Sequence, residues 1–229
     1  MLYILRLVAR TFQEAINSVF HFLTGNYFLP IPDPSLASRS MKSIVILGGS
    51  FAGVSAAHRI LKHATKTSPV KITLVSPNTH FYWNIAVPRA LLPEQVSDDK
   101  IFQPIAAGFS QYPASIFEFI VASAESLDVE AKKVRISGSV GMKTLDYDLL
   151  ILATGSRTTA NTPFKSLGST EATKDALHDF QTQVKNSKTI VLAGAGPTGT
   201  EIAGELSFEY GQQKRIILVS LKHPGQLSP

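Results

Sequence analysis

The stretch Val191-Leu192-Ala193-Gly194-Ala195-Gly196-Pro197-Thr198-Gly199 decides the fold of this chain, and Val45-Ile46-Leu47-Gly48-Gly49-Ser50-Phe51-Ala52-Gly53 repeats its pattern earlier. In each stretch a short apolar strand runs into a glycine turn, and a helical pattern follows. The first glycine of such a turn allows a tight bend, and the last lets the helix pack closely on the sheet. The backbone N–H groups at the start of the helix can then bind a pyrophosphate. Two such loops predict two nucleotides held close enough to exchange electrons.

Strands and helices alternate around both loops, which is typical of a parallel doubly wound sheet. We therefore predict an α/β fold with two Rossmann-like βαβ nucleotide-binding units, one for FAD and one for NAD(P), the second of them incomplete. The FAD-binding domain is expected over residues 41–165 and a truncated NAD(P)-binding domain over residues 166–229. The predicted elements are strands 43–47, 71–76, 117–122 and 149–153, helices 52–64 and 172–186, a hairpin over 130–137 and 143–146, and a second βαβ unit over 189–220. The strand over 149–153 is predicted to be buried.

Residues 1–40 differ from the rest of the chain. Apolar residues recur there at intervals of three and four, which predicts an amphipathic helix; they are Leu5, Val8, Phe12, Ile16, Val19 and Leu23. Three prolines and a serine-rich linker follow. Polar residues interrupt any apolar run long enough to cross a bilayer. Three interpretations stay open for residues 1–30: a helix packed on its own domain, a helix on a membrane surface, or a mitochondrial presequence. A cytoplasmic location is the default.

The first loop departs from the usual pattern at two positions. Ser50 stands where the middle glycine is expected, and Ser76 stands where the second strand normally ends in an acidic residue that holds the ribose. The second loop keeps all three glycines, and Glu201 follows on the opening turn of its helix. Ser220 occupies the ribose-reading position of this unit, with Lys222 two residues further on. Because a carboxylate there would repel a 2′-phosphate, its absence permits NADPH without excluding NADH.

Composition excludes several classes of function. The chain has no cysteine, so disulfides, thiolate zinc sites and a redox-active cysteine pair are all excluded, and electrons would leave a flavin directly for an external acceptor. The net charge of +5 is spread along the chain without a basic stripe. We therefore expect no nucleic-acid partner. No side chain is singled out as a catalytic group or a metal ligand.

Four segments in one order resemble a known family: Val45 to Ala57, Asn78 to Ala90, Ala153-Thr154-Gly155, and Gly194 to Glu201. Together they resemble the pyridine nucleotide-disulfide oxidoreductase superfamily. Within it they are most similar to the apoptosis-inducing-factor-like proteins related to mitochondrion-associated inducer of death, also called ferroptosis suppressor. The resemblance covers about residues 42 to 220, and the stretch from Phe81 to Ala90 narrows it to the subfamily.

The resemblance implies a flavin enzyme that passes hydride from NAD(P)H to FAD and then electrons to a quinone or another small-molecule acceptor. It implies that Arg89 contacts FAD near its phosphates or flavin, that Val121 bonds the adenine through its backbone, and that Thr154 and Gly155 lie beside FAD. The remaining implied contacts are Gly48, Gly49, Ser50, Phe51, Ala52 and Gly53 with the FAD pyrophosphate, and Gly194, Ala195, Gly196, Pro197, Thr198, Gly199 and Glu201 with the nicotinamide nucleotide.

Two other interpretations compete with the enzyme. One is a catalytically inactive nucleotide-binding or interaction protein left by truncation of such an enzyme, which the substitutions at Ser50 and Ser76 favour. The other is a single-cofactor NAD dehydrogenase with a degenerate first domain. For a single-cofactor dehydrogenase, the chain lacks a recognisable catalytic acid or base, and the Ala153-Thr154-Gly155 element is left unexplained.

Overall fold

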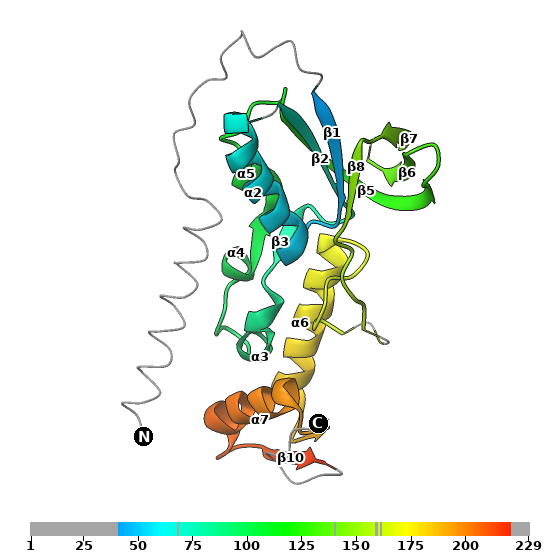
Figure 1. Ribbon diagram of the computed structural model, residues 1–229. Helices are drawn as coiled ribbons and strands as arrows, with labels where there is room; N and C mark the ends of the chain where they lie inside the picture. Colours follow the sequence, from blue (N-terminus) through cyan, green and yellow to red (C-terminus); the bar gives the residue numbers. More distant parts are fainter. Residues whose placement is uncertain (1–40, 68, 140, 159, 161, 221–229) are drawn as a thin grey trace. The chain divides into compact units, whose positions relative to one another are not determined.

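The computed structural model describes residues 41–220 except 68, 140, 159 and 161 (Figure 1). The described chain forms two compact units that interleave in sequence. The first unit contains the residues up to Phe81 and returns for Pro104–Gly155. The second contains Tyr82–Gln103 and the residues from Ser156 onward. Residues 82–103 thus belong to the same unit as the second glycine loop. The assignment of FAD to residues 41–165 and of NAD(P) to residues 166–229 stays a prediction.

The first unit is built on a six-stranded sheet with the order β7-β6-β5-β2-β1-β8. Neighbours among β5, β2, β1 and β8 run parallel, and β5, β6 and β7 are antiparallel. This arrangement confirms the predicted α/β class. The elements of the first unit are β1 (Lys42–Leu47), α2 (Phe51–Thr67), β2 (Val70–Ser76), α5 (Ile105–Gly108), β5 (Phe117–Asp128), β6 (Lys133–Gly138), β7 (Gly141–Asp146) and β8 (Leu149–Leu152).

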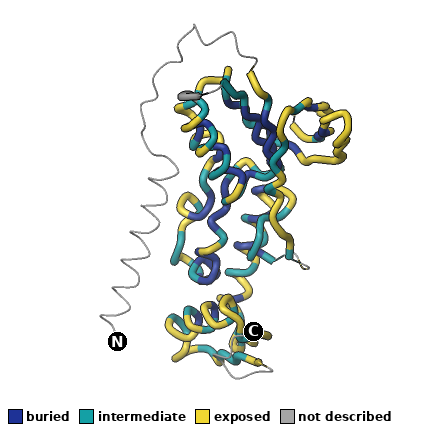
Figure 2. The backbone as a smooth tube through the Cα atoms, in the orientation of Figure 1, coloured by how far each residue is buried: buried dark blue, intermediate teal, exposed yellow. Residues whose placement is uncertain are grey.

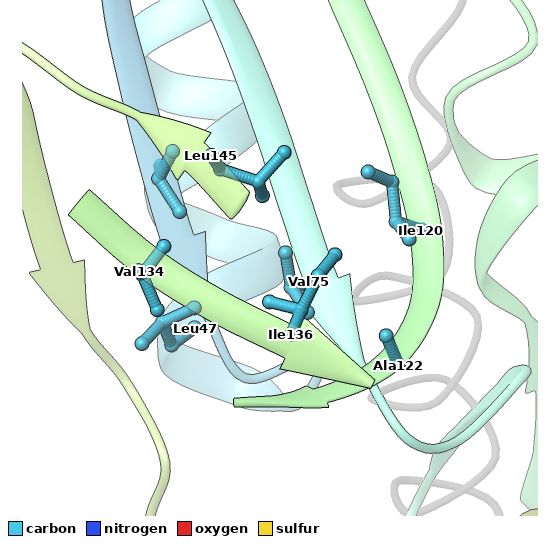
Figure 3. Packing of buried hydrophobic residues seen from close by; sticks show 8 residues of the cluster. Leu47, Val75, Ile120, Ala122, Val134, Ile136 and Leu145 are labelled. Carbon is cyan, nitrogen blue, oxygen red and sulfur yellow. The ribbon is translucent and has the colours of Figure 1, made fainter. Parts of the chain in front are cut away.

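A hydrophobic core cluster of the first unit lies between the parallel strands and the β6–β7 hairpin (Figure 3). Leu47 and Val75 point from β1 and β2 toward Val134 and Ile136 of β6, and Val45 of β1 belongs to the same cluster. Successive strand residues point to opposite faces, so the alternate positions of β1 and β2 face the other way, where α2 packs on both strands. The strands are buried on both faces, which explains why their sequences are continuous apolar runs.

The position of strand β8 in the sequence is predicted correctly, but its burial is not. It pairs in parallel with β1, and Asp148, just before it, accepts a 2.7 Å hydrogen bond from the Ser43 N–H through its carboxylate. Leu149 and Leu152 nevertheless expose 54% and 65% of their surface. The prediction of a buried strand is therefore wrong for these residues, because β8 is the last strand of the sheet among the residues that the structure describes.

A histidine of α2 lies among aromatic rings. His58 of α2 stacks on Phe109 at 4.0 Å between ring centroids, and its Nδ1 lies 3.3 Å from the Tyr112 hydroxyl. Its Nε2 is buried and has no hydrogen-bond partner among the described residues. This desolvation lowers the pKa of His58 to about 4.

The chain leaves the first unit within β3 (His80–Tyr82) and returns within β4 (Phe102–Pro104), and these two strands pair with each other. In the second unit, Tyr82 donates a 2.6 Å hydrogen bond from its hydroxyl to the Pro163 carbonyl, and Asn84 donates a 3.0 Å bond to the Phe164 carbonyl. The elements of this unit are η2 (Asn84–Ala86), α3 (Val87–Ala90), α4 (Asp98–Ile101), α6 (Thr170–Asn186), β9 (Thr189–Ala193), α7 (Pro197–Tyr210) and β10 (Arg215–Val219).

The second unit forms a small parallel βαβ unit in which β9 pairs with β10 and α7 packs against both. Figure 2 shows few buried residues in α7 and β10, and only Ile202 and Leu206 of α7 are buried. Helix α6 begins at Thr170, two residues before the predicted start, because the Ser169 side chain caps it by accepting a hydrogen bond from the Ala172 N–H.

The predictions for residues 1–40 and for Lys222 lie outside the described residues, and localisation likewise stays a prediction. In the part of the chain that the structure describes, no helix combines the length and hydrophobicity that a membrane span needs.

Candidate functional site

The first glycine turn follows β1 and leads into α2. Gly48 has a φ of +118°, a conformation that residues with a Cβ rarely adopt. Its N–H donates a 2.8 Å hydrogen bond to the Val75 carbonyl, which fixes the bend at the end of β1. A Cβ on Gly48 would lie 2.1 Å from the carbonyl oxygen of Ala153. Conformation and space therefore both require glycine at this position.

The residues after Gly48 pack against the ends of neighbouring elements. A Cβ on Gly49 would lie 2.7 Å from the Ser76 Cβ and 2.8 Å from Ile105 Cδ1. A Cβ on Gly53 would lie 1.8 Å from the Gly48 carbonyl oxygen, so α2 approaches the turn as closely as the sequence motif predicts. Phe51 packs edge-to-face on Phe81, with 4.7 Å between ring centroids.

The substitution at Ser50 is compatible with this turn. The Ser50 carbonyl accepts a 2.9 Å hydrogen bond from the Val54 N–H, so Ser50 directly precedes the first turn of α2. Its counterpart in the second turn, Gly196, has φ −72° and ψ 178°, which any residue adopts. Serine is also among the residues preferred before the first turn of a helix. The missing glycine therefore causes no backbone strain.

The sheet gathers the other residues expected near FAD at the same edge. Leu47, the last residue of β1, lies opposite Val75 on one side and Leu152 on the other, and Ser76 lies opposite Val121. Parallel strands end at one edge, where ligands bind in open α/β sheets. Thr154 and Gly155 follow β8 at this edge, and both are exposed. The first turn, Val121, Thr154 and Gly155 are thus brought together.

Two details at this edge refine the expected contacts. The Val121 carbonyl already accepts hydrogen bonds from the N–H and the hydroxyl of Ser139, at 3.1 and 2.9 Å. A backbone bond from Val121 to adenine would therefore use its N–H. The ribose position is occupied by Ser76 and therefore has no carboxylate. Ser76 is 3% exposed, and its hydroxyl accepts a 3.2 Å hydrogen bond from the Asn78 N–H.

The second glycine turn has nearly the same backbone as the first. Gly194 has a φ of +110°, and its N–H donates a 2.8 Å hydrogen bond to the Val219 carbonyl. A Cβ on Gly199 would lie 2.0 Å from the Gly194 carbonyl oxygen, as at Gly53 in the first turn. Pro197 opens α7, where a missing N–H costs no hydrogen bond. Both turns therefore direct a helix N-terminus toward the carboxyl edge of parallel strands.

The surroundings of this turn are more open. An added Cβ at Gly194 or Gly196 meets no atom within 4 Å among the described residues. Gly194, Thr198 and Gly199 line a cavity of about 530 Å³, whose other walls come mainly from apolar side chains of α6, β9 and α7. Ala195 is half-buried, and Glu201 is exposed on α7.

The family model of pyridine nucleotide-disulphide oxidoreductases matches residues 42–222, which contain both turns. This chain belongs to that family. Oxidoreductase ptaL of Pestalotiopsis fici is 55% identical over 182 residues, which cover 79% of this chain and 49% of that protein. Ferroptosis suppressor protein 1 of Homo sapiens is 30% identical over 176 residues, which cover 77% of this chain and 43% of that protein. The resemblance drawn from the sequence is confirmed.

A solved structure agrees at the level of the fold. The sulfide:quinone oxidoreductase from Aquifex aeolicus superposes with a TM-score of 0.57 at 24% identity, covering 75% of this chain and 40% of that chain. This chain therefore spans less than half of that structure and about half the length of oxidoreductase ptaL. The activity of the whole family members is accordingly a proposal for this chain.

Arg89, which the resemblance associates with FAD, has its contacts in the second unit. Its guanidinium donates a 2.7 Å hydrogen bond to the Glu205 carboxylate of α7 and a second bond to the Gln95 side chain. The partner Glu205 was not among the predicted residues. Its only sequence signal is a position four residues after Glu201, which places the two carboxylates on one face of a helix.

The aromatic stretch that narrows the subfamily has a packing role in this structure. Tyr82 and Trp83 are buried. Burial raises the pKa of Tyr82 well above its usual value, and the nearby Asp98 raises it further, so Tyr82 keeps its proton near neutral pH. Among the described residues, no group of three or more histidine, aspartate or glutamate side chains is placed to bind a metal ion.

Proposed function

We propose that this chain binds FAD at its first glycine turn and NAD(P)H at its second, and that it belongs to an oxidoreductase that passes electrons from NAD(P)H through FAD to a quinone or another small-molecule acceptor. The observation that carries the proposal is the repetition of one turn geometry, Gly48–Gly53 and Gly194–Gly199, before two long helices.

The first turn fits the pyrophosphate of FAD. The N-terminus of the 17-residue helix α2 offers N–H groups and a positive dipole end to an anion. The pyrophosphate would approach the backbone of Gly48, Gly49 and Ser50. Phe51 and Ala52 are the first two residues of α2. Val121 would bond the adenine through its N–H, the buried Ser76 faces the ribose position, and Thr154 and Gly155 border the cofactor.

The second turn fits a nicotinamide dinucleotide. Gly194, Ala195, Gly196, Pro197, Thr198 and Gly199 lead into the 14-residue helix α7. The open space at Gly196 allows the pyrophosphate to approach the backbone closely. Glu201 lies one turn into the helix, where we expect it to contact the ribose or nicotinamide part. Ser220, rather than a carboxylate, follows β10, so either NADH or NADPH is accepted.

FAD, when bound, accepts the hydride from the nicotinamide ring and delivers electrons onward. The residues of this chain bind and orient the two nucleotides, and no side chain of theirs needs to transfer a proton. The chain contains no cysteine, so a dithiol relay within it is excluded and the electrons pass to an external acceptor. The subfamily resemblance favours a quinone for that role.

The test uses the purified full chain. With FAD added, we expect a yellow protein after gel filtration, calorimetric binding of NADH or NADPH, and bleaching of the flavin absorbance under anaerobic conditions. A matched control is Gly196→Val, whose Cβ would meet no described atom within 4 Å, and it should keep FAD while losing NAD(P)H binding. A chain that takes up no FAD would overturn the proposal.

A second outcome would support the alternative of an inactive nucleotide-binding protein. The observation in its favour is the absence of a carboxylate at the ribose position, where Ser76 is buried and holds the Asn78 N–H. Calorimetric binding of both nucleotides without bleaching of the flavin would indicate this alternative.

A further inference from the structure

Helix α3 connects the two long helices of the second unit. On one side, Gln181 of α6 donates a 2.7 Å hydrogen bond to the Ala90 carbonyl at the end of α3. On the other side, Arg89 of α3 pairs with Glu205 of α7 at 2.7 Å. The short helix α3 is thus bonded to both α6 and α7, and it also packs against α7.

This connection matters because α7 buries few side chains, although it also packs against β9 and β10. Only Ile202 and Leu206 of this helix are buried, and the cavity of about 530 Å³ separates its inner face from α6. A helix with few buried side chains has few constraints on its direction. The Arg89–Glu205 pair adds a polar contact between α3 and α7, and both of its side chains are about one-third exposed.

Charge gives Arg89 a second role. Glu201 and Glu205 lie four residues apart, so their carboxylates share one face of α7. An anionic dinucleotide at the start of α7 meets this negative face. Glu209 lies four residues further along the same face, so Arg89, by neutralising Glu205, leaves two of these three carboxylates without this compensation.

We propose that Arg89 is a positioning residue of the second nucleotide site: by pairing with Glu205 it fixes helix α7 and offsets its negative charge, and so promotes NAD(P)H binding. The inference rests on the proposed function, and it differs from the contact with FAD that the family resemblance implies. Glu205 is the ninth residue of α7, about 12 Å along the helix from Pro197. Arg89 therefore acts through the helix and not by touching the pyrophosphate.

The test compares Arg89→Gln, Glu205→Gln and the double variant by calorimetry with NADH, NADPH and FAD. We expect Arg89→Gln to weaken NAD(P)H binding about tenfold, with a larger effect at low salt because exposed charges are screened. Glu205→Gln removes the contact but also removes the negative charge, so it should weaken binding only about two- to threefold. The double variant should match Glu205→Gln. FAD affinity should stay within about twofold in all three, since the first turn is unchanged.

A charge swap and a matched control complete the design. Arg89→Glu combined with Glu205→Arg should restore most of the NAD(P)H affinity that Arg89→Gln loses. Lys174→Gln removes a cation of α6 that pairs with Glu171 rather than with α7, so it should leave NAD(P)H affinity unchanged.

The outcomes separate the possible roles. If Arg89→Gln weakens FAD binding and leaves NAD(P)H binding intact, Arg89 is a flavin contact and the inference is overturned. If the variant lowers the melting temperature and both affinities alike, or changes neither affinity, Arg89 has no specific role at the second site and the inference fails. If the unchanged protein binds no NADH or NADPH, the proposed function of the second turn fails, and the inference fails with it.

Discussion

In the first glycine turn a Cβ on Gly48 would lie 2.1 Å from the Ala153 carbonyl oxygen, whereas in the second turn a Cβ on Gly194 meets no described atom within 4 Å. The two backbones are otherwise alike, with φ values of +118° and +110° and the same hydrogen bond to the neighbouring strand. The first turn is enclosed by protein and the second is open. Packing and conformation therefore both require glycine at position 48, whereas among the described residues only the conformation requires it at position 194.

The largest expected effect comes from alanine at the first glycine of each turn. Gly48→Ala should lower the free energy of unfolding by about 4 kcal/mol, because left-handed backbone strain adds to a steric clash. Gly194→Ala should cost only about 2 kcal/mol, since it introduces the strain alone. Urea denaturation of the full chain measures both. Equal losses would show that the clash with Ala153 relaxes and that the two turns do not differ in enclosure.

An intermediate effect is expected on binding when the middle residues are exchanged between the turns. Gly196→Ser should lower NAD(P)H affinity about tenfold, equivalent to about 1.4 kcal/mol, because the side chain enters the space where the pyrophosphate approaches. The stability of the protein should hardly change, since the backbone at Gly196 suits serine. The reciprocal Ser50→Gly should raise FAD affinity slightly. Calorimetry with each nucleotide measures both, and a destabilised Gly196→Ser variant would contradict the open character of the second turn.

The smallest effect concerns pH and the first unit. The pKa of His58 is lowered from 6.5 to about 4 by burial, so the unfolded chain binds the proton more readily than the folded one. Stability is therefore fully present above pH 6.5 and declines as the pH falls toward 4. Because the ring is partly exposed, we expect a loss of about 1 kcal/mol rather than the full linkage value.

Denaturation series at several pH values test this prediction. The His58→Phe variant is the control, because it keeps an aromatic ring against Phe109 without a titrating group. The loss over this pH range should be smaller in the variant than in the original protein. Identical pH profiles would show that another group dominates.

Sequence periodicity predicted the long elements well because they carry enough residues to show a period. The strands β1 and β2, the helices α2 and α6, and the β9-α7-β10 unit all lie close to their predicted bounds. The strand β5 continues to Asp128, six residues beyond its predicted end. Its second half leaves β2 and pairs with β6 across an irregular register, with exposed polar residues that show no strand pattern.

The short elements between residues 80 and 108 could not be predicted, because three or four residues do not define a period. At the site, the glycine turns followed from the sequence, since a bend and a close approach admit few residues. The Arg89–Glu205 pair did not, because its members are 116 residues apart and neither belongs to a shared motif. The roles of the nucleotide-contacting residues stay predictions.

The interleaving of the two units has a consequence for how the chain emerges from the ribosome. Residues 82–103 leave the ribosome long before Pro163, Phe164 and Glu205, their partners in the second unit. At a synthesis rate of about 5–20 residues per second, Arg89 waits roughly 6 to 23 s for Glu205. During this time the apolar side chains of Val87, Leu91 and Leu92, buried in the finished protein, have no completed unit to enter. Nascent chains halted between residues 104 and 160 should therefore engage chaperones more strongly than chains released at full length.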